Sequence, residues 1–162
     1  MPPPEAATAA SLDRAAFVVS IDTEMAWGLN HRQGQTYRYD RERLDMARLL
    51  DLFDRYEIPA TWAVVGHLML DGCAPVDGVK HPEIVRPDFE WFEGDWFDDD
   101  PGGSAAADSV WFAPDLVEAI RRTRTPHETG SPGFSHTMAG EPGCPRATLD
   151  SATRPAVAAP TA

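Results

Sequence analysis

Two carboxylates, Asp22 and Glu24, stand one residue apart at the end of a short apolar run, and their types and spacing could do chemistry. The run spans residues 17–21 and is rich in β-branched side chains, which is typical of a buried strand. Functional sites of α/β proteins form at the carboxyl ends of such strands, and alternate residues of a strand share a face. The pair could therefore hold a metal ion, accept a proton or cap the following loop, although solvated acids are the commoner outcome of this pattern alone.

The elements expected around this pair form a β-α-β unit. The first strand is expected over residues 16–21 and the second over 60–66. Between them, apolar residues recur at helical spacing over 41–56, which predicts a helix with Asp40 as its N-cap. A β-α-β unit implies parallel neighbouring strands joined by a right-handed crossover.

The second half of the chain contains fewer elements that could pack. Short helices are expected over 67–70 and 114–122, and a strand followed by a loop over 126–136. The stretch 72–108 is rich in Pro, Gly, Asp and aromatic residues, so we expect a long loop whose aromatic rings form a small core of their own. Stacking of these rings on a sugar is the alternative.

Composition and end segments limit the possible classes of protein. The formal net charge of −12 argues against nucleic acid or an anionic membrane surface as a partner. The two cysteines, Cys73 and Cys144, form no Cys-x-x-Cys pair, which excludes a zinc ribbon or a thioredoxin-type site but leaves one disulfide or two free thiols open. No apolar run reaches the roughly 18 residues of a membrane span, and the N-terminus does not read as a signal peptide, so a cytoplasmic chain is expected.

Three segments, taken in order, resemble the polysaccharide deacetylase family of carbohydrate esterases. They are Ser-Ile-Asp-Thr-Glu at 20–24, Leu-Leu-Asp-Leu-Phe-Asp-Arg-Tyr-Glu-Ile-Pro-Ala-Thr-Trp-Ala-Val-Val-Gly at 49–66 and His-Glu-Thr-Gly-Ser-Pro-Gly-Phe-Ser-His at 127–136. The resemblance covers roughly residues 16–146. It implies an α/β fold that is the N-terminal part of a distorted parallel (β/α) barrel, here incomplete, and hydrolytic removal of N-acetyl groups from sugars.

The resemblance also implies roles for individual residues. Asp22 matches the family's general base, His136 matches its second metal histidine, and Glu24, or less favourably Asp22 itself, would be the metal carboxylate. The implied cofactor is a divalent metal ion, zinc or cobalt, and the implied partner is an acetylated carbohydrate. Such a metal lowers the pKa of its bound water and stabilises the oxyanion, while the base takes the proton of that water.

The chain departs from the family pattern at Pro132, four residues before His136, where the family has its first metal histidine. Proline offers no lone pair, so we expect weakened metal binding and impaired activity. His127 is a poor substitute, because the family's residue at that place is not a ligand. The alternative is a non-catalytic remnant or a carbohydrate-binding fragment.

The expected organisation is a disordered lead-in over 1–14, a partial deacetylase-like domain over 15–146 and a low-complexity tail over 147–162. The family's later motifs, including its acid histidine, are not found after His136, so a truncation or a change of reading frame is expected.

Three other polar features are expected to be structural. His67 follows a strand and is expected to pack or cap, while His81 precedes Pro82 in a loop and is expected to be solvated. The acidic run 98–100 is expected to be a solvated turn, since it lacks the spacing of a calcium loop.

Overall fold

The computed structural model describes residues 14–29 and 41–158 of the chain. Residues 1–13 of the expected lead-in, the N-cap Asp40 and most of the loop before it lie outside these ranges. The centre of the fold is a three-stranded parallel sheet with the order β1-β2-β5. Its strands are β1 (Ser20–Thr23), β2 (Thr61–Val64) and β5 (Glu128–Gly130). The expected mixed α/β class and the parallel β-α-β unit are thus confirmed, and the described residues form no closed barrel.

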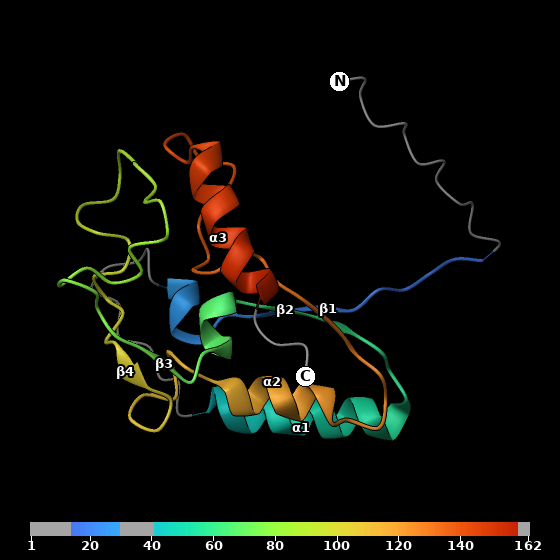
Figure 1. Cartoon of the computed structure of the whole chain (residues 1–162). Coiled ribbons are helices and arrows are strands. Elements are labelled where there is room, and N and C mark those ends of the chain that lie inside the picture. The colour runs from blue at the N-terminus through green and yellow to red at the C-terminus, as the bar shows by residue number, and fades with distance from the viewer. Residues whose placement is uncertain (1–13, 30–40, 159–162) are drawn as a thin grey trace.

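Helices lie on both sides of this sheet. Figure 1 shows α1 (Glu42–Tyr56) and α2 (Pro114–Arg121) next to one another on one side, and α3 (Arg146–Ala158) on the other. Leu50 and Phe53 of α1 are buried against the sheet, as the helical spacing predicts. The helix ends where Glu57 adopts a left-handed conformation, φ 54°, and donates its N–H to the Phe53 carbonyl.

The first strand differs from its expected place. It covers Ser20–Thr23, and the preceding Phe17 and Val18 are 94% and 75% exposed. The ladder with β2 begins where the Thr61 N–H donates to the Val19 carbonyl, 2.9 Å away. Pro59 lies just upstream of that point and has no N–H, so pairing does not extend back along residues 17–18.

The stretch 72–108 is a long loop, as expected, but its buried aromatic rings do not form a core of their own. They belong to the main hydrophobic core, where the Phe97 ring contacts those of Trp27 and Phe134. The only regular pairing of this loop in the described part is the short antiparallel ladder of β3 (Gly72–Cys73) and β4 (Gly103–Ser104). A Cβ on Gly72 would lie 2.2 Å from the Gly103 carbonyl oxygen, so glycine permits this close approach. Trp96 and Phe97 are buried, whereas Trp91 stays half exposed.

The segment expected to be a structureless tail is in large part helix α3, so that prediction is wrong. Thr148 and Ala152 lie one turn apart and are both buried, and α3 packs near the 3-10 helix η2 (Gly66–Met69). The Thr148 hydroxyl donates to the Arg86 carbonyl at 3.2 Å. Small side chains on one face of a helix allow close packing but give no strong apolar periodicity in the sequence. The high helix propensity of alanine, and not an apolar pattern, therefore accounts for this helix.

None of the helices in the described ranges combines the length and the apolar character needed to cross a bilayer.

Candidate functional site

The structure brings two of the sequence-predicted site residues into direct contact at the carboxyl edge of the sheet. Glu24 follows β1 and His136 follows β5, and Glu24 Oε1 lies 2.9 Å from His136 Nε2. The two side chains are 22% and 27% exposed, so solvent reaches them while the surroundings partly desolvate them. We call Asp22, Glu24 and His136 the strand-end site.

Two non-glycine residues around this site have backbone conformations that are rare for residues with a side chain. Met25 has φ 48° and His136 has φ 53°, both in the left-handed region. Each such residue costs about 1–3 kcal/mol and persists where the surrounding structure imposes it, which occurs most often at functional sites. A Cβ on Gly28 would lie 2.6 Å from Glu24 Oε2, so the glycine leaves room for the carboxylate in this position.

The loop between β5 and His136 is anchored by the η2 backbone. The Gly66 N–H donates to the Gly133 carbonyl and the His67 N–H donates to the Phe134 carbonyl, both at 2.9 Å. Phe134 is buried, whereas Pro132 is exposed on the same loop. The loop that carries His136 is therefore anchored by η2, and Pro132, four residues before His136, offers no ligand atom.

Asp22 and Glu24 line a common cavity of about 460 Å³. That volume is within the range of about 300–1,000 Å³ that is typical of small-molecule sites. Glu42 and Asp45 of α1 add two more carboxylates to its wall, and burial raises the pKa of Glu42. The apolar part of the wall comes from residues of β1, β2 and α1, namely Ile21, Trp62, Met46 and Leu49.

His127 lies at the other edge of the sheet. It precedes β5, its Nδ1 accepts the Ala60 N–H at 3.1 Å, and its ring contacts Phe53 and Trp62 at 5.8 Å each. Residue 60 precedes β2, so His127 lies at the amino ends of the strands whose carboxyl ends carry Glu24 and His136. It therefore cannot replace the ligand missing at Pro132.

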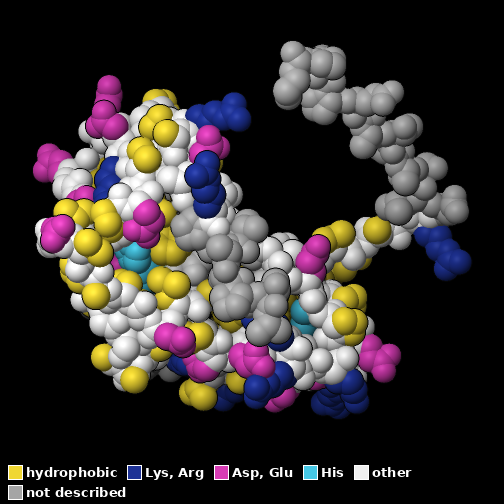
Figure 2. All heavy atoms as spheres, in the orientation of Figure 1, with side chains coloured by type: hydrophobic (Ala, Val, Ile, Leu, Met, Phe, Trp, Pro, Cys, Tyr) yellow, Lys and Arg dark blue, Asp and Glu magenta, His cyan; other side chains and the backbone are white. Residues whose placement is uncertain are grey.

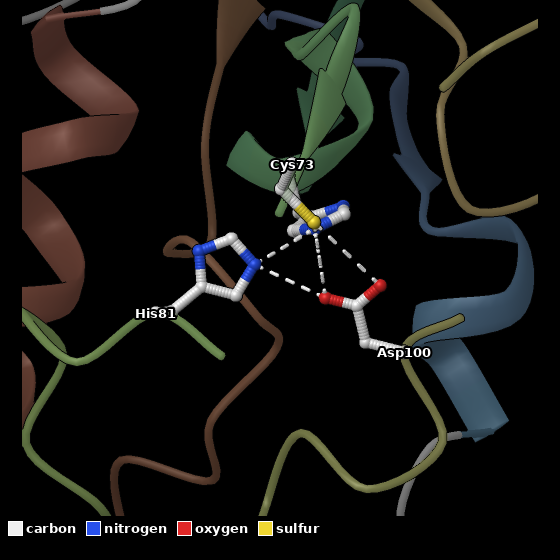
Figure 3. A group of neighbouring side chains, drawn as sticks. Cys73, His81 and Asp100 are labelled. Carbon is white, nitrogen blue, oxygen red and sulfur yellow. Dashed lines mark hydrogen bonds and ion pairs between the residues drawn. The ribbon is translucent and has the colours of Figure 1, made fainter. Parts of the chain in front are cut away.

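A second constellation, which the sequence reasoning did not find, is buried behind this edge. His67, Cys73, His81 and Asp100 each direct one ligand atom to a common point, and these atoms lie within 4.8 Å of one another. Figure 3 shows Cys73, His81 and Asp100 pointing toward one another. We call these four residues the buried cluster. Such a set of nitrogen, sulfur and oxygen atoms could hold a metal ion.

Three different parts of the fold supply the buried cluster. His67 is in η2, Cys73 is in β3, and His81 and Asp100 come from the long loop between β3 and β4. His67 and Asp100 are completely buried and His81 is 7% exposed. The expectation that His81 is solvated is therefore wrong, and so is the solvated turn at 98–100, because Asp100 turns inward while Asp98 and Asp99 stay exposed.

The charge state of this cluster follows from its burial and its hydrogen bonds. Burial alone would raise the pKa of Asp100, but its contacts with the His67 and His81 imidazoles and the hydrogen bond from the Gly102 N–H outweigh burial and hold that pKa well below its ordinary range. Burial, followed by the negative charge of Asp100, raises the pKa of the Cys73 thiol to about 12. Cys73 and Cys144 both carry free thiols, so the alternative without a disulfide is the one observed.

No protein family, curated protein or solved structure matches this chain in comparisons with known proteins.

Proposed function

We propose that the chain is a hydrolase of the polysaccharide deacetylase type, which releases acetate from N-acetylated sugars at a strand-end site that lacks one metal ligand. The observation that carries this proposal is the 2.9 Å contact between Glu24 and His136. Two motifs more than a hundred residues apart meet there, at the edge where parallel α/β sheets place functional groups.

The cavity beside this contact suits the products of the reaction. Hydrolysis of an N-acetyl group leaves an amine on the sugar, and this amine takes up a proton to become a cation at neutral pH. Four carboxylates line the cavity, those of Asp22, Glu24, Glu42 and Asp45. Their negative charge complements a cationic amino sugar as well as a divalent metal ion.

The strand-end site fits a divalent metal ion only in part. Glu24 Oε1 and His136 Nε2 supply an oxygen and a nitrogen ligand 2.9 Å apart, whereas catalytic zinc sites commonly have three protein ligands. Pro132, at the expected place of the third, offers none. Metal binding is therefore expected to be weak at this site.

The residues themselves can still divide the work of amide hydrolysis. Water adds to the acetyl carbonyl, the C–N bond breaks, and acetate and the amine leave. Asp22 is an exposed carboxylate on the cavity wall, so it can accept the proton of the attacking water and return it to the amine nitrogen as the C–N bond breaks. Glu24 fixes the orientation of the His136 imidazole through their contact.

The test is acetate release from chitin oligomers and acetylated peptidoglycan fragments, with increasing zinc, cobalt or manganese. We expect slow release by the natural chain that rises with metal concentration, and a fall of about 10²–10⁴-fold in Asp22→Asn, because that variant loses its general base. Circular dichroism spectra of both proteins confirm that the variant is folded.

The absence of ligand atoms at Pro132 favours one alternative, carbohydrate binding without turnover. If the folded chain and its Pro132→His variant both fail to release acetate at every metal concentration, the hydrolase proposal is wrong. Retained binding of the oligomers in the same samples would then support the alternative.

A further inference from the structure

We propose that His67, Cys73, His81 and Asp100 form a structural zinc site, separate from the strand-end site. All four residues belong to the described part of the chain, and none of them carries a role in the proposed hydrolysis.

Five of the six distances between the four ligand atoms are close to those of a tetrahedral zinc site, and the sixth, between Cys73 Sγ and His81 Nε2, is at most 4.8 Å. Bonds of about 2.0–2.3 Å at tetrahedral angles place neighbouring ligand atoms about 3.3–3.6 Å apart. His67 Nε2 lies 3.1 Å from His81 Nε2 and 3.2 Å from Asp100 Oδ2, and His81 Nε2 lies 3.1 Å from the same oxygen. Cys73 Sγ lies 3.7 Å from His67 Nε2 and 3.5 Å from Asp100 Oδ2, the longer spacing that the larger sulfur requires.

The partners of the outer atoms orient the ligands toward the common point. His67 Nδ1 lies 3.1 Å from the Trp111 carbonyl, which can only accept, so Nδ1 carries a proton and a neutral His67 presents the lone pair of Nε2 to the cluster. His81 Nδ1 faces the Glu83 carboxylate at 3.5 Å, and Asp100 Oδ1 accepts the Gly102 N–H at 2.9 Å. Contacts of this kind orient zinc ligands in proteins.

A divalent cation also resolves the hydrogen bonding inside the cluster. With its proton on Nδ1, His67 has no proton on Nε2 to donate to His81 or to Asp100, although both approach that nitrogen within 3.2 Å. A zinc ion between them accepts lone pairs from all of these atoms. The Cys73 thiolate and the Asp100 carboxylate then balance its two positive charges, so the buried site is neutral as a whole.

The ligand set indicates zinc and a structural role. A thiolate together with imidazoles selects zinc over magnesium or calcium, which prefer oxygen ligands. Four protein ligands close the coordination sphere and leave no position for substrate, as in structural sites. The site would fasten the long loop to η2, where the described residues provide only the two-residue strands β3 and β4 as regular structure.

Two cationic side chains, Lys80 and Arg86, bind backbone carbonyls of the long loop that carries His81 and Asp100. Lys80 donates to the carbonyls of Phe97 and Asp98, both at 3.1 Å, and to that of Asp100. Arg86 donates to the His81 carbonyl at 2.7 Å. These two cations therefore hold the backbone of both loop ligands.

The test is zinc binding by the full chain, stripped with a chelator under reducing conditions and titrated in competition with a chromogenic chelator. We expect one tight zinc per chain, and a loss of affinity of at least about 100-fold in Cys73→Ser and Asp100→Asn, since even changes in residues that orient ligands cost about 10–100-fold. The matched controls are Cys144→Ser and Asp99→Asn, which should bind as the natural chain does.

Cobalt provides a readout that does not depend on the stability of a variant. The cobalt-loaded chain should show the intense visible bands of tetrahedral coordination and a thiolate-to-cobalt band, and Cys144→Ser should keep this band. The proposal is overturned if the natural chain binds no zinc, if Cys73→Ser keeps the thiolate band, or if tight binding is lost in Glu24→Gln and retained in Asp100→Asn. That last pattern would place the ion at the strand-end site.

Discussion

Replacing Pro132 with histidine is expected to raise the affinity of the strand-end site for zinc or cobalt by at least about 10–100-fold. The substitution adds a direct ligand, and even mutations of residues that only orient metal ligands change affinity by about that factor. The new imidazole would stand four residues before His136, on the loop that η2 anchors through the Gly133 and Phe134 carbonyls. Pro132 is exposed, so the larger side chain meets no packed neighbour at its own position.

The measurement is calorimetric titration of a second metal equivalent, after the buried cluster has been filled. Pro132→Ala is the matched control, since it removes the proline without adding a ligand, and it should behave as the natural chain does. Equal second-site affinities for Pro132→His and Pro132→Ala would show that the loop does not direct residue 132 toward Glu24 and His136.

Removing zinc should lower the stability of the chain substantially. A ligand that binds only the folded state at a thousand times its dissociation constant contributes about 4 kcal/mol of unfolding free energy. For a domain of this size, about 4 kcal/mol corresponds to a shift of about 8–16 °C in the midpoint of thermal unfolding. The expected result is a midpoint that falls by this amount when a chelator replaces excess zinc.

Two cysteine variants make this measurement specific. Cys144→Ser should show the same zinc-dependent shift as the natural chain, and Cys73→Ser should show little of it. A shift of equal size in both variants would mean that zinc stabilises the fold through another site.

The strand-end site could be predicted because its signals are local. Asp22 lies near the end of β1, Glu24 follows that strand directly and His136 follows β5, so the topology of a parallel sheet brings them to one edge. The 2.9 Å contact of Glu24 with His136 confirms that these two residues meet. The role of Asp22 as a base stays a prediction, although its place on the cavity wall is consistent with that role.

The buried cluster could not be predicted in the same way, because no short spacing joins its members. His67 stands in a 3-10 helix, Cys73 in a two-residue strand, and Asp100 at the end of an acidic run whose other members are exposed. Only the fold of the long loop selects Asp100 from that run and turns it toward the histidines. Burial of a carboxylate beside two imidazoles is a tertiary property that charge patterning does not reveal.

The start of β1 and the helix α3 were also mispredicted, because in both cases burial depends on tertiary contacts that the sequence pattern does not contain. The apolar character of Phe17 and Val18 indicates a buried strand, yet burial depends on a neighbour, and pairing with β2 stops at Val19. Thr148 and Ala152 carry little apolar signal, yet α3 packs through them because small side chains allow close approach.

Trp27 contacts both sites, one through its ring and the other through its backbone. The Trp27 ring lies 4.5 Å from the His67 ring, and the Trp27 backbone N–H donates to the Glu24 carbonyl at 3.0 Å. A zinc ion on His67 would therefore stiffen the backbone that carries Glu24. We therefore propose that the chain has two separate metal-binding centres, one with a complete set of four ligands and one that lacks a ligand.

Anomalous X-ray scattering tests this claim most directly. Crystals grown with zinc, measured on both sides of the zinc absorption edge, should show one strong peak between His67, Cys73, His81 and Asp100 in the natural chain. Crystals of Pro132→His should show that peak and a second one beside Glu24 and His136. A natural chain with no peak at the buried cluster, or a Pro132→His variant with none at the strand-end site, would contradict it.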